Sequence, residues 1–283
     1  MAIGIAEKLM HMTVRLECRL RNGATATGTG FFFAYAVEGK GDLFVIVTNK
    51  HVIEGSQSGT FVLTRQGPDG DPVVGSYERA SFDNFEALWF KHPSPDVDLA
   101  VFPIGPVLNY AQQRGVTFFV PPLVEMHIPT HEVLRELSGI ESILMIGYPN
   151  GIWDEKNNLP IVRRGLTATS PKFDYDGSPE FLIDCACFPG SSGSPVVIFD
   201  QGAFSDAMGN TQIGLRLILL GVLYAGPQHE AEGDIVTVQT SLAKRQIALS
   251  RIPNNLGFVV KAQKLQDFKP MLIAFAKALD GNK

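Results

Sequence analysis

An all-β fold is predicted by three features of the sequence. Short runs rich in β-branched and aromatic residues recur along the chain, and most are bounded by Gly, Pro, Asp or Asn. The 283 residues include 28 Gly and 18 Pro, a content that favours many turns between short strands. Twelve such runs form two groups of six on either side of a less regular segment. We therefore predict two six-stranded antiparallel β-barrels.

The elements follow one another in a simple order. Predicted strands of the N-terminal barrel, about residues 12–105, lie at 12–20, 28–37, 43–50, 60–66, 86–92 and 99–104. A connector follows at about 105–138, with one short helical stretch at His131–Leu137. The C-terminal barrel, about 139–262, contains the runs ESILMIGYP, IVRRGLTAT, FLIDCAC, SPVVIFD, LILLGVLYA and NLGFVVKA. We expect the whole chain, 1–283, to form one functional domain.

A C-terminal helix is predicted at about 267–280. Asp267 is its expected N-cap, and Pro270 is tolerated in a first turn. Its apolar face would be formed by Met271, Leu272, Phe275 and Leu279.

Composition and charge argue against several classes of protein. The formal net charge of −5 disfavours a nucleic-acid partner, because such domains usually carry a basic patch. We find no signal-peptide core and no run of the roughly 18 apolar residues that a membrane span needs. We expect a soluble cytoplasmic protein with no membrane partner.

The three cysteines are expected to be free thiols. Cys185 and Cys187 are two apart in a predicted strand, so they lie on the same face and are badly placed to bond each other. No Cys/His cluster has zinc-ligand spacing, so neither a metal nor another cofactor is predicted.

Three segments carry candidate catalytic groups. FVIVTNKHVIEG places His51 where a strand leaves its sheet, and SPDVDLAVFPI places Asp98 directly before an apolar strand. FPGSSGSPVV, residues 188–197, contains three serines. Taken singly, a structural histidine, a solvated acid and a Gly/Ser turn would each explain these residues. Together they follow the order His, Asp, Ser, one of the known arrangements of a nucleophilic triad.

These segments resemble motifs of the trypsin-like, chymotrypsin-fold serine proteases, and most closely the bacterial high-temperature-requirement kind. VTNKHVI resembles the histidine motif, DVDLAVF the aspartate motif and DCACFPGSSGSPVV the nucleophile motif. Further similarity lies in GTGFFF, IGYPNG, LLGVLYAG and NLGFVVKA, so it covers roughly residues 12 to 266. The resemblance implies the chymotrypsin type of two-barrel fold and a serine endopeptidase that acts through an acyl-enzyme.

The resemblance also implies residue roles. Ser192 would be the nucleophile, His51 the base and Asp98 the group that orients it, while the N–H groups of Gly190 and Ser192 would form the oxyanion hole. Ala186 would form the base of the primary pocket, with walls from Tyr224, Ala225 and Gly226. No acid stands at that base, so we expect cleavage of a protein or peptide substrate after small or medium apolar residues.

Other interpretations remain open at this level. An α/β-hydrolase is disfavoured because Pro195 and the following valines continue as strand rather than helix. A catalytically silent protease-fold domain that binds peptides or partners is the stronger alternative.

The segment 151–165 is either an activation or substrate loop or a plain surface connection. Lys50 would lower the pKa of His51 if it pointed inward, or lie in solvent. The oligomeric state is left open.

Overall fold

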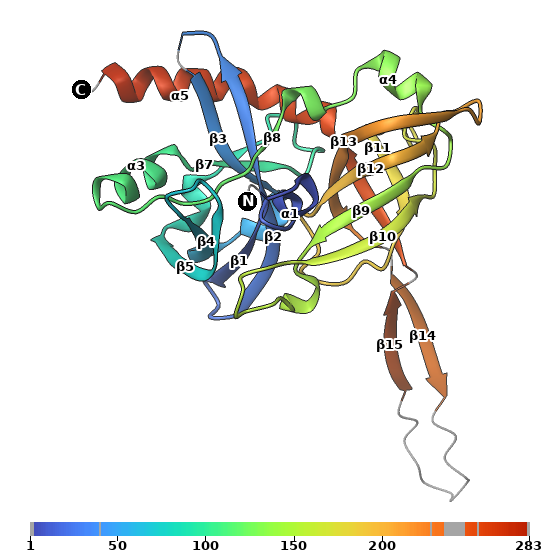
Figure 1. Ribbon diagram of the computed structural model, residues 1–283. Coiled ribbons are helices and arrows are strands. Elements are labelled where there is room, and N and C mark those ends of the chain that lie inside the picture. Colours follow the sequence, from blue (N-terminus) through green and yellow to red (C-terminus); the bar gives the residue numbers. More distant parts are fainter. Residues whose placement is uncertain (1–2, 40, 227, 235–246, 254, 282–283) are drawn as a thin grey trace, which may run out of the picture.

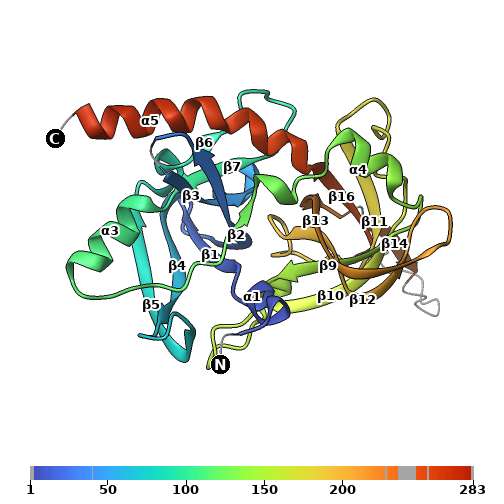
Figure 2. The same cartoon turned by 45° about the horizontal axis from the view of Figure 1, so that its top comes forward.

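The computed structural model describes residues 3–39, 41–226, 228–234, 247–253 and 255–281. Two β units lie side by side, with the C-terminal helix lying across the N-terminal unit and reaching the second unit at its start (Figures 1 and 2). The helices are α1 (Ile5–Met10), α2 (Lys50–Ile53), α3 (Gly105–Gln113), α4 (His131–Glu136) and α5 (Lys269–Gly281), with 3-10 turns at Phe85–Leu88, Glu125–His127, Pro149–Gly151 and Ala262–Phe268. None of the described helices is long and apolar enough to cross a bilayer.

The N-terminal unit is an eight-stranded sheet. Its strands are β1 (Thr13–Leu20), β2 (Thr25–Val37), β3 (Gly41–Thr48), β4 (Ser56–Gln66), β5 (Pro72–Asp83), β6 (Phe90–Lys91), β7 (Ala100–Pro103) and β8 (Leu123–Val124). They run in the order β5-β4-β1-β2-β3-β7-β6, with β8 parallel to β2. Large apolar side chains such as Phe61, Phe85 and Phe102 fill the space against this sheet.

The C-terminal unit is a closed barrel in the order β10-β11-β16-β13-β12-β9. Its strands are β9 (Ser142–Gly147), β10 (Ile161–Thr167), β11 (Glu180–Asp184), β12 (Pro195–Ser205), β13 (Thr211–Ala225) and β16 (Leu256–Lys261). A separate hairpin of β14 (Gln228–Asp234) and β15 (Ile247–Pro253) extends away from the barrel (Figure 1).

The observed elements correct several expectations. The predicted strand at 86–92 is a 3-10 turn followed by the two-residue β6. β5 and α3 were not predicted, although the short helix near His131 was. In the described pairings the N-terminal sheet stays open between β5 and β6. The expected pair of six-stranded barrels is therefore not confirmed for this half, while a mostly β protein is.

The C-terminal helix begins later than predicted. The chain first forms 3-10 turns from Ala262 to Phe268 and enters α5 directly from them, so Asp267 is not an N-cap. Its carboxylate instead contacts His92 Nε2 at 3.0 Å. Leu272 is buried in the core shared by the two units, whereas Leu279 is 44% exposed.

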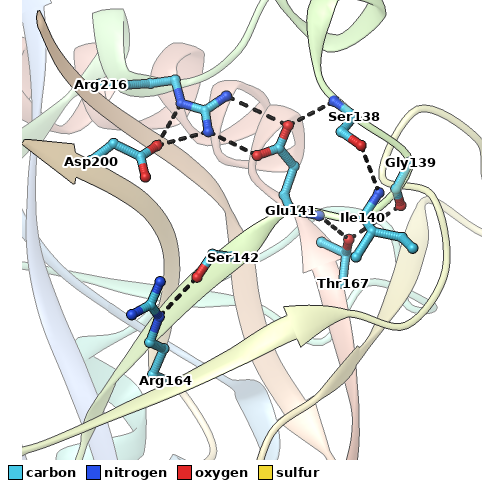
Figure 3. Close-up of polar contacts among 9 residues, drawn as sticks. All are labelled: Ser138, Gly139, Ile140, Glu141, Ser142, Arg164, Thr167, Asp200 and Arg216. Carbon is cyan, nitrogen blue, oxygen red and sulfur yellow. Dashed lines mark hydrogen bonds and ion pairs between the residues drawn. The ribbon is translucent and has the colours of Figure 1, made fainter. Parts of the chain in front are cut away.

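A partly buried polar cluster lies at the end of the barrel where β9 begins (Figure 3). Arg216 on β13 donates to Glu141 Oε2 at 2.8 Å and to Asp200 Oδ2 at 2.7 Å. Glu141 also accepts from the Ser138 N–H at 2.6 Å. Burial acts to lower the pKa of Arg216, but the bonds and charges of the two carboxylates outweigh it and the pKa is raised. This cation is therefore fully paired.

All three cysteines are buried and unbonded, as predicted. Burial raises the pKa of Cys18 to about 12, and it also raises that of Cys187 to about 12. At neutral pH these thiols are protonated and behave as small apolar side chains. No group of metal-ligating side chains occurs among the residues that the structure describes.

Candidate active site

His51 lies at the end of β3, where the sequence placed it. The strand ends at Thr48, and the chain turns through α2, which contains His51 in its single turn. Thr48 and Asn49 are fully buried, and Thr48 Oγ1 donates to the Thr29 carbonyl at 2.7 Å. The residues that precede His51 in the chain are thereby fixed, while its ring remains exposed to solvent on one side.

The register of two strands brings Asp98 to His51. β3 pairs antiparallel with β7, and Thr48 lies opposite Ala100. The residue three after Thr48 and the residue two before Ala100 therefore reach the same edge of the sheet. His51 Nδ1 lies 2.5 Å from Asp98 Oδ2, and the His51 backbone N–H donates to Asp98 Oδ1 at 3.2 Å. With Nδ1 facing the carboxylate, Nε2 is left to take up a proton.

The backbone of Asp98 is also held in place by a side chain. Asn49 Nδ2 donates to the Asp98 carbonyl oxygen at 2.8 Å. Lys50 does not face the imidazole, because its ammonium donates to the Ser94 carbonyl oxygen at 2.7 Å. Partial burial lowers the pKa of Lys50, and the charge of Asp98 acts in the opposite direction. Lys50 thus tethers the segment that precedes Asp98.

The segment before the serines forms a tight turn. The Ser191 N–H donates to the Phe188 carbonyl oxygen at 2.9 Å, and Gly190 has φ +85°. Pro at the second position and Gly with positive φ at the third are typical of a type II turn. A side chain at Gly190 would place its Cβ 2.6 Å from the Tyr148 carbonyl oxygen. Only glycine fits this position without moving the backbone.

Thr29 of the N-terminal sheet fixes the orientation of this turn. Its N–H donates to the Ser192 carbonyl oxygen at 2.8 Å, and its hydroxyl donates to the Gly190 carbonyl oxygen at 2.9 Å. Both carbonyls are thus committed to Thr29. Within the described chain, the N–H groups of Gly190 and Ser192 donate to no protein acceptor. These are the two donors that the sequence assigned to an oxyanion hole.

The three serines have different environments. Ser191 and Ser194 are 1% and 0% exposed, and their hydroxyls have no partner among the described residues. Ser192 is only half-buried, and its Oγ donates to the Tyr224 carbonyl oxygen at 3.2 Å. Of the three hydroxyls, that of Ser192 is the one a substrate could reach.

Ser192 and His51 are not hydrogen-bonded to each other in the described chain. The His51–Asp98 pair is formed, whereas the Ser192 hydroxyl is directed to β13. Such a bond is often absent before substrate binds, and rotation about one side-chain torsion redirects a serine hydroxyl. The structure therefore provides two parts of the site and leaves their last hydrogen bond open.

Of the predicted substrate-binding residues, Tyr224 contacts Ser192 directly, through its backbone carbonyl. Tyr224 precedes Ala225 at the end of β13, and its hydroxyl donates to Glu180 Oε2 at 2.8 Å. Burial is the main cause that raises the pKa of Tyr224, and the charges of Glu180 and Asp98 add to it. Gly226 packs against Cys187, because a Cβ at this position would lie 3.3 Å from the Cys187 Cβ.

One residue at this site was missed by the sequence analysis. Arg163 on β10 donates from Nη1 to the carbonyl oxygen of Ala186, the predicted pocket base. Along β10 its neighbours Val162 and Arg164 are exposed, whereas Arg163 is half-buried. A charged residue at an inward position of the alternating run IVRRGLT was the available signal.

The segment 151–165 is anchored to the N-terminal sheet. Asn158 Nδ2 donates to Thr64 Oγ1 at 2.9 Å, and the Trp153 ring lies 5.6 Å from the Arg15 guanidinium carbon. These contacts fit a surface connection between the two units. A role in activation remains a hypothesis that they do not test.

A family model for the trypsin-like peptidase domain matches residues 28–204. This chain belongs to the trypsin-like peptidase family. No curated protein matches the sequence significantly. Among solved structures, the HtrA-type protease AlgW with a bound tripeptide is similar, with 16% identity, a TM-score of 0.50, and coverage of 97% of this chain and 65% of the longer AlgW chain. Its likeness shows a shared chymotrypsin-like protease fold.

Two further structures are more distant. The serine endoprotease from Yersinia pestis is 14% identical with a TM-score of 0.44, over 97% of this chain and 68% of that one. The active form of the Rv3671c protease from M. tuberculosis is 17% identical with a TM-score of 0.43, over 93% and 81%. Neither adds to the assignment.

Proposed function

We propose that this protein is a serine endopeptidase with His51, Asp98 and Ser192 as its catalytic triad. The observation that carries the proposal is the 2.5 Å contact between His51 Nδ1 and Asp98 Oδ2, beside an accessible serine in a Gly-x-Ser-Gly turn. Membership of the trypsin-like family supports a hydrolase of this class. The whole chain acts as one protease domain.

The mechanism follows from the groups in place. Once Ser192 turns from Tyr224 to His51, its oxygen attacks the scissile carbonyl carbon and its proton passes to His51 Nε2. The carbonyl oxygen becomes an oxyanion that the free N–H groups of Gly190 and Ser192 can bind. His51 then gives the proton to the leaving amine as the C–N bond breaks, which leaves an acyl-Ser192 ester.

Water completes the cycle. The water oxygen attacks the ester carbonyl carbon while His51 takes a proton from the water. His51 then gives the proton to Ser192 Oγ as the C–O bond breaks. Asp98 faces Nδ1 throughout, which holds the imidazole in orientation and stabilises its charged form. These steps require no cofactor.

We further propose that the substrate is a protein or peptide chain in the cytoplasm. The similar AlgW structure contains a tripeptide, which supports a peptide substrate. Three buried free thiols agree with a reducing compartment.

A peptide-binding module without catalysis is the second candidate. It is favoured by one observation, the hydrogen bond from Ser192 Oγ to the Tyr224 carbonyl instead of to His51. In that case the domain would hold an extended peptide beside β13 without cleaving it.

Covalent labelling separates the two candidates. A fluorophosphonate should label the native chain at one site, and Ser192→Ala should abolish both labelling and peptide cleavage. Ser191→Ala and Ser194→Ala are matched controls in the same turn and should keep labelling. A native chain that binds peptides but resists the reagent would support the binding module, and labelling retained in Ser192→Ala would contradict the assigned nucleophile.

A further inference from the structure

The Arg163 guanidinium lies at the base of the predicted primary pocket. Its Nη1 donates to the carbonyl oxygen of Ala186, and its central carbon lies 4.8 Å from the centre of the Phe188 ring. Ala186 and Phe188 precede Ser192 on the segment that leads to it. The cation therefore adjoins the predicted base, toward which the substrate side chain before the scissile bond would point.

This cation has no anionic partner among the residues that the structure describes. No carboxylate in the described residues forms an ion pair with Arg163, although a guanidinium carries five N–H donors in a fork that suits a carboxylate. Burial lowers the pKa of Arg163, while the neighbouring Cys185 and Cys187 sulfurs act in the opposite direction. An arginine nevertheless stays protonated in proteins, so a partly desolvated positive charge remains at this place.

The same barrel shows what a structural arginine looks like. At its other end Arg216 is bound by both Glu141 and Asp200 (Figure 3). Placing a charge away from water costs free energy unless it is paired. Both arginines are half-buried, but the Arg216 charge is balanced by two carboxylates, whereas Arg163 pairs with none in the described chain and is still within reach of a ligand.

We infer that Arg163 selects substrates with an acidic side chain, glutamate or aspartate, directly before the scissile bond. The carboxylate would pair with the guanidinium at Ala186. This inference rests on the proposed protease function. It replaces the preference for small or medium apolar residues, which we expected because no acid stands at Ala186.

Binding to the inactive chain tests the inference without catalysis. In the Ser192→Ala protein, calorimetry would compare an alanine-rich hexapeptide containing one Glu with the same peptide containing Gln. A charge-assisted bond should make the Glu peptide bind about 10-fold to 100-fold more tightly. Adding Arg163→Gln should bring the two dissociation constants within about twofold of each other, since it removes the charge.

Arg164→Gln is the matched control. It removes the same charge one residue away, on the exposed face of β10, where Arg164 Nε donates to Ser142 Oγ. It should leave the preference for Glu intact. Arg163→Lys keeps the charge and should retain part of the preference, and melting curves of every variant check that the barrel is folded.

Activity of the intact chain gives the second arm. The value of kcat/KM for cleavage after Glu should exceed that for Gln, Ala and Val by about tenfold or more. A protein that fluorophosphonate labels but that cleaves equally well after Ala or Val would overturn the role of Arg163 and leave the protease standing. A protein that resists the reagent, yet binds the Glu peptide through Arg163, would overturn the protease and leave the recognition site standing.

Discussion

The N-terminal sheet and the C-terminal barrel build their parts of the site by different means. In the sheet, regular pairing of β3 with β7 brings His51 to Asp98, and a side-chain contact of 2.5 Å completes the pair. In the barrel, the proposed nucleophile Ser192 lies in an irregular turn that depends on glycines with positive φ at Gly190 and Gly193. A side-chain substitution on a strand can leave its register unchanged, whereas a side chain at either glycine would strain the turn.

Thr29 connects the two parts. It lies on β2 of the sheet, yet its N–H and hydroxyl hold the carbonyls of Ser192 and Gly190. The comparison teaches that the contact between His51 and Asp98 forms within the N-terminal sheet alone. The orientation of the turn at Gly190–Ser192 depends on contact between the sheet and the barrel. Substitutions at Asp98 should therefore lower the reaction rate, whereas substitutions at Thr29 should lower the stability of the contact between the two units.

The largest effect is expected at Asp98. Asp98→Asn keeps the shape of the side chain but no longer stabilises a charged imidazole and favours the wrong tautomer, so kcat should fall by about 10⁴-fold. Steady-state kinetics with a peptide amide would measure this, with a melting curve as the control for folding. A loss below about tenfold would show that Asp98 does not orient His51 for catalysis.

Gly190→Ala should come next. The added Cβ would meet the Tyr148 carbonyl oxygen at 2.6 Å and disfavour φ +85°, so the turn should reorganise. Loss of one oxyanion donor typically lowers kcat by about 10² to 10³-fold. Rapid kinetics would separate acylation from deacylation. Unchanged kcat would mean that the Gly190 N–H takes no part in the reaction.

Thr29→Val tests the connection between the units. Removal of the hydroxyl leaves the Gly190 carbonyl without its donor and the Tyr148 N–H without its acceptor, both of which are buried contacts. We expect unfolding to become easier by about 1–3 kcal/mol. Chemical denaturation would measure the loss, and Thr29→Ser serves as the control that keeps the hydroxyl. Equal stability of the Val and Ser variants would contradict the proposed link.

The smallest effect is expected at Ser191. Its buried hydroxyl has no partner among the described residues, so Ser191→Ala removes a polar group that burial disfavours. Activity should stay within about twofold and stability should be unchanged or slightly higher. A marked loss of activity in otherwise folded protein would show that this hydroxyl acquires a partner during turnover.

Much of this site could be predicted from the chain itself. His51 and Asp98 each stand beside an apolar run that becomes a buried strand, and Gly190 occupies a turn whose Pro-Gly pair specifies positive φ. These are local signals, because side-chain alternation and turn chemistry act over a few residues. The role of Ala186 and its neighbours came from resemblance alone.

Other features were beyond such reasoning. The prediction of a strand at 86–92 was wrong because Phe85, just before this range, and Trp89 within it pack into the core around a 3-10 turn. A short apolar run does not distinguish such a turn from a strand. The start of α5 was misplaced because Asp267 contacts His92, far away in sequence. The closing of the sheet into a barrel in only one half likewise depends on long-range pairing.

By itself, the sequence determined the mostly β character of the chain, the residues that we propose as catalytic and the turn that presents Ser192, since these depend on neighbours along the chain. Only the tertiary structure decided that Ser192 donates to Tyr224, that Thr29 orients the turn of Ser192, and that Arg163 reaches Ala186 with no acidic partner in the described part of the chain. Each of these contacts joins residues more than twenty positions apart, and it forms only when separate strands pack together. Whether a charge is balanced by the protein or left for a ligand is decided by that packing.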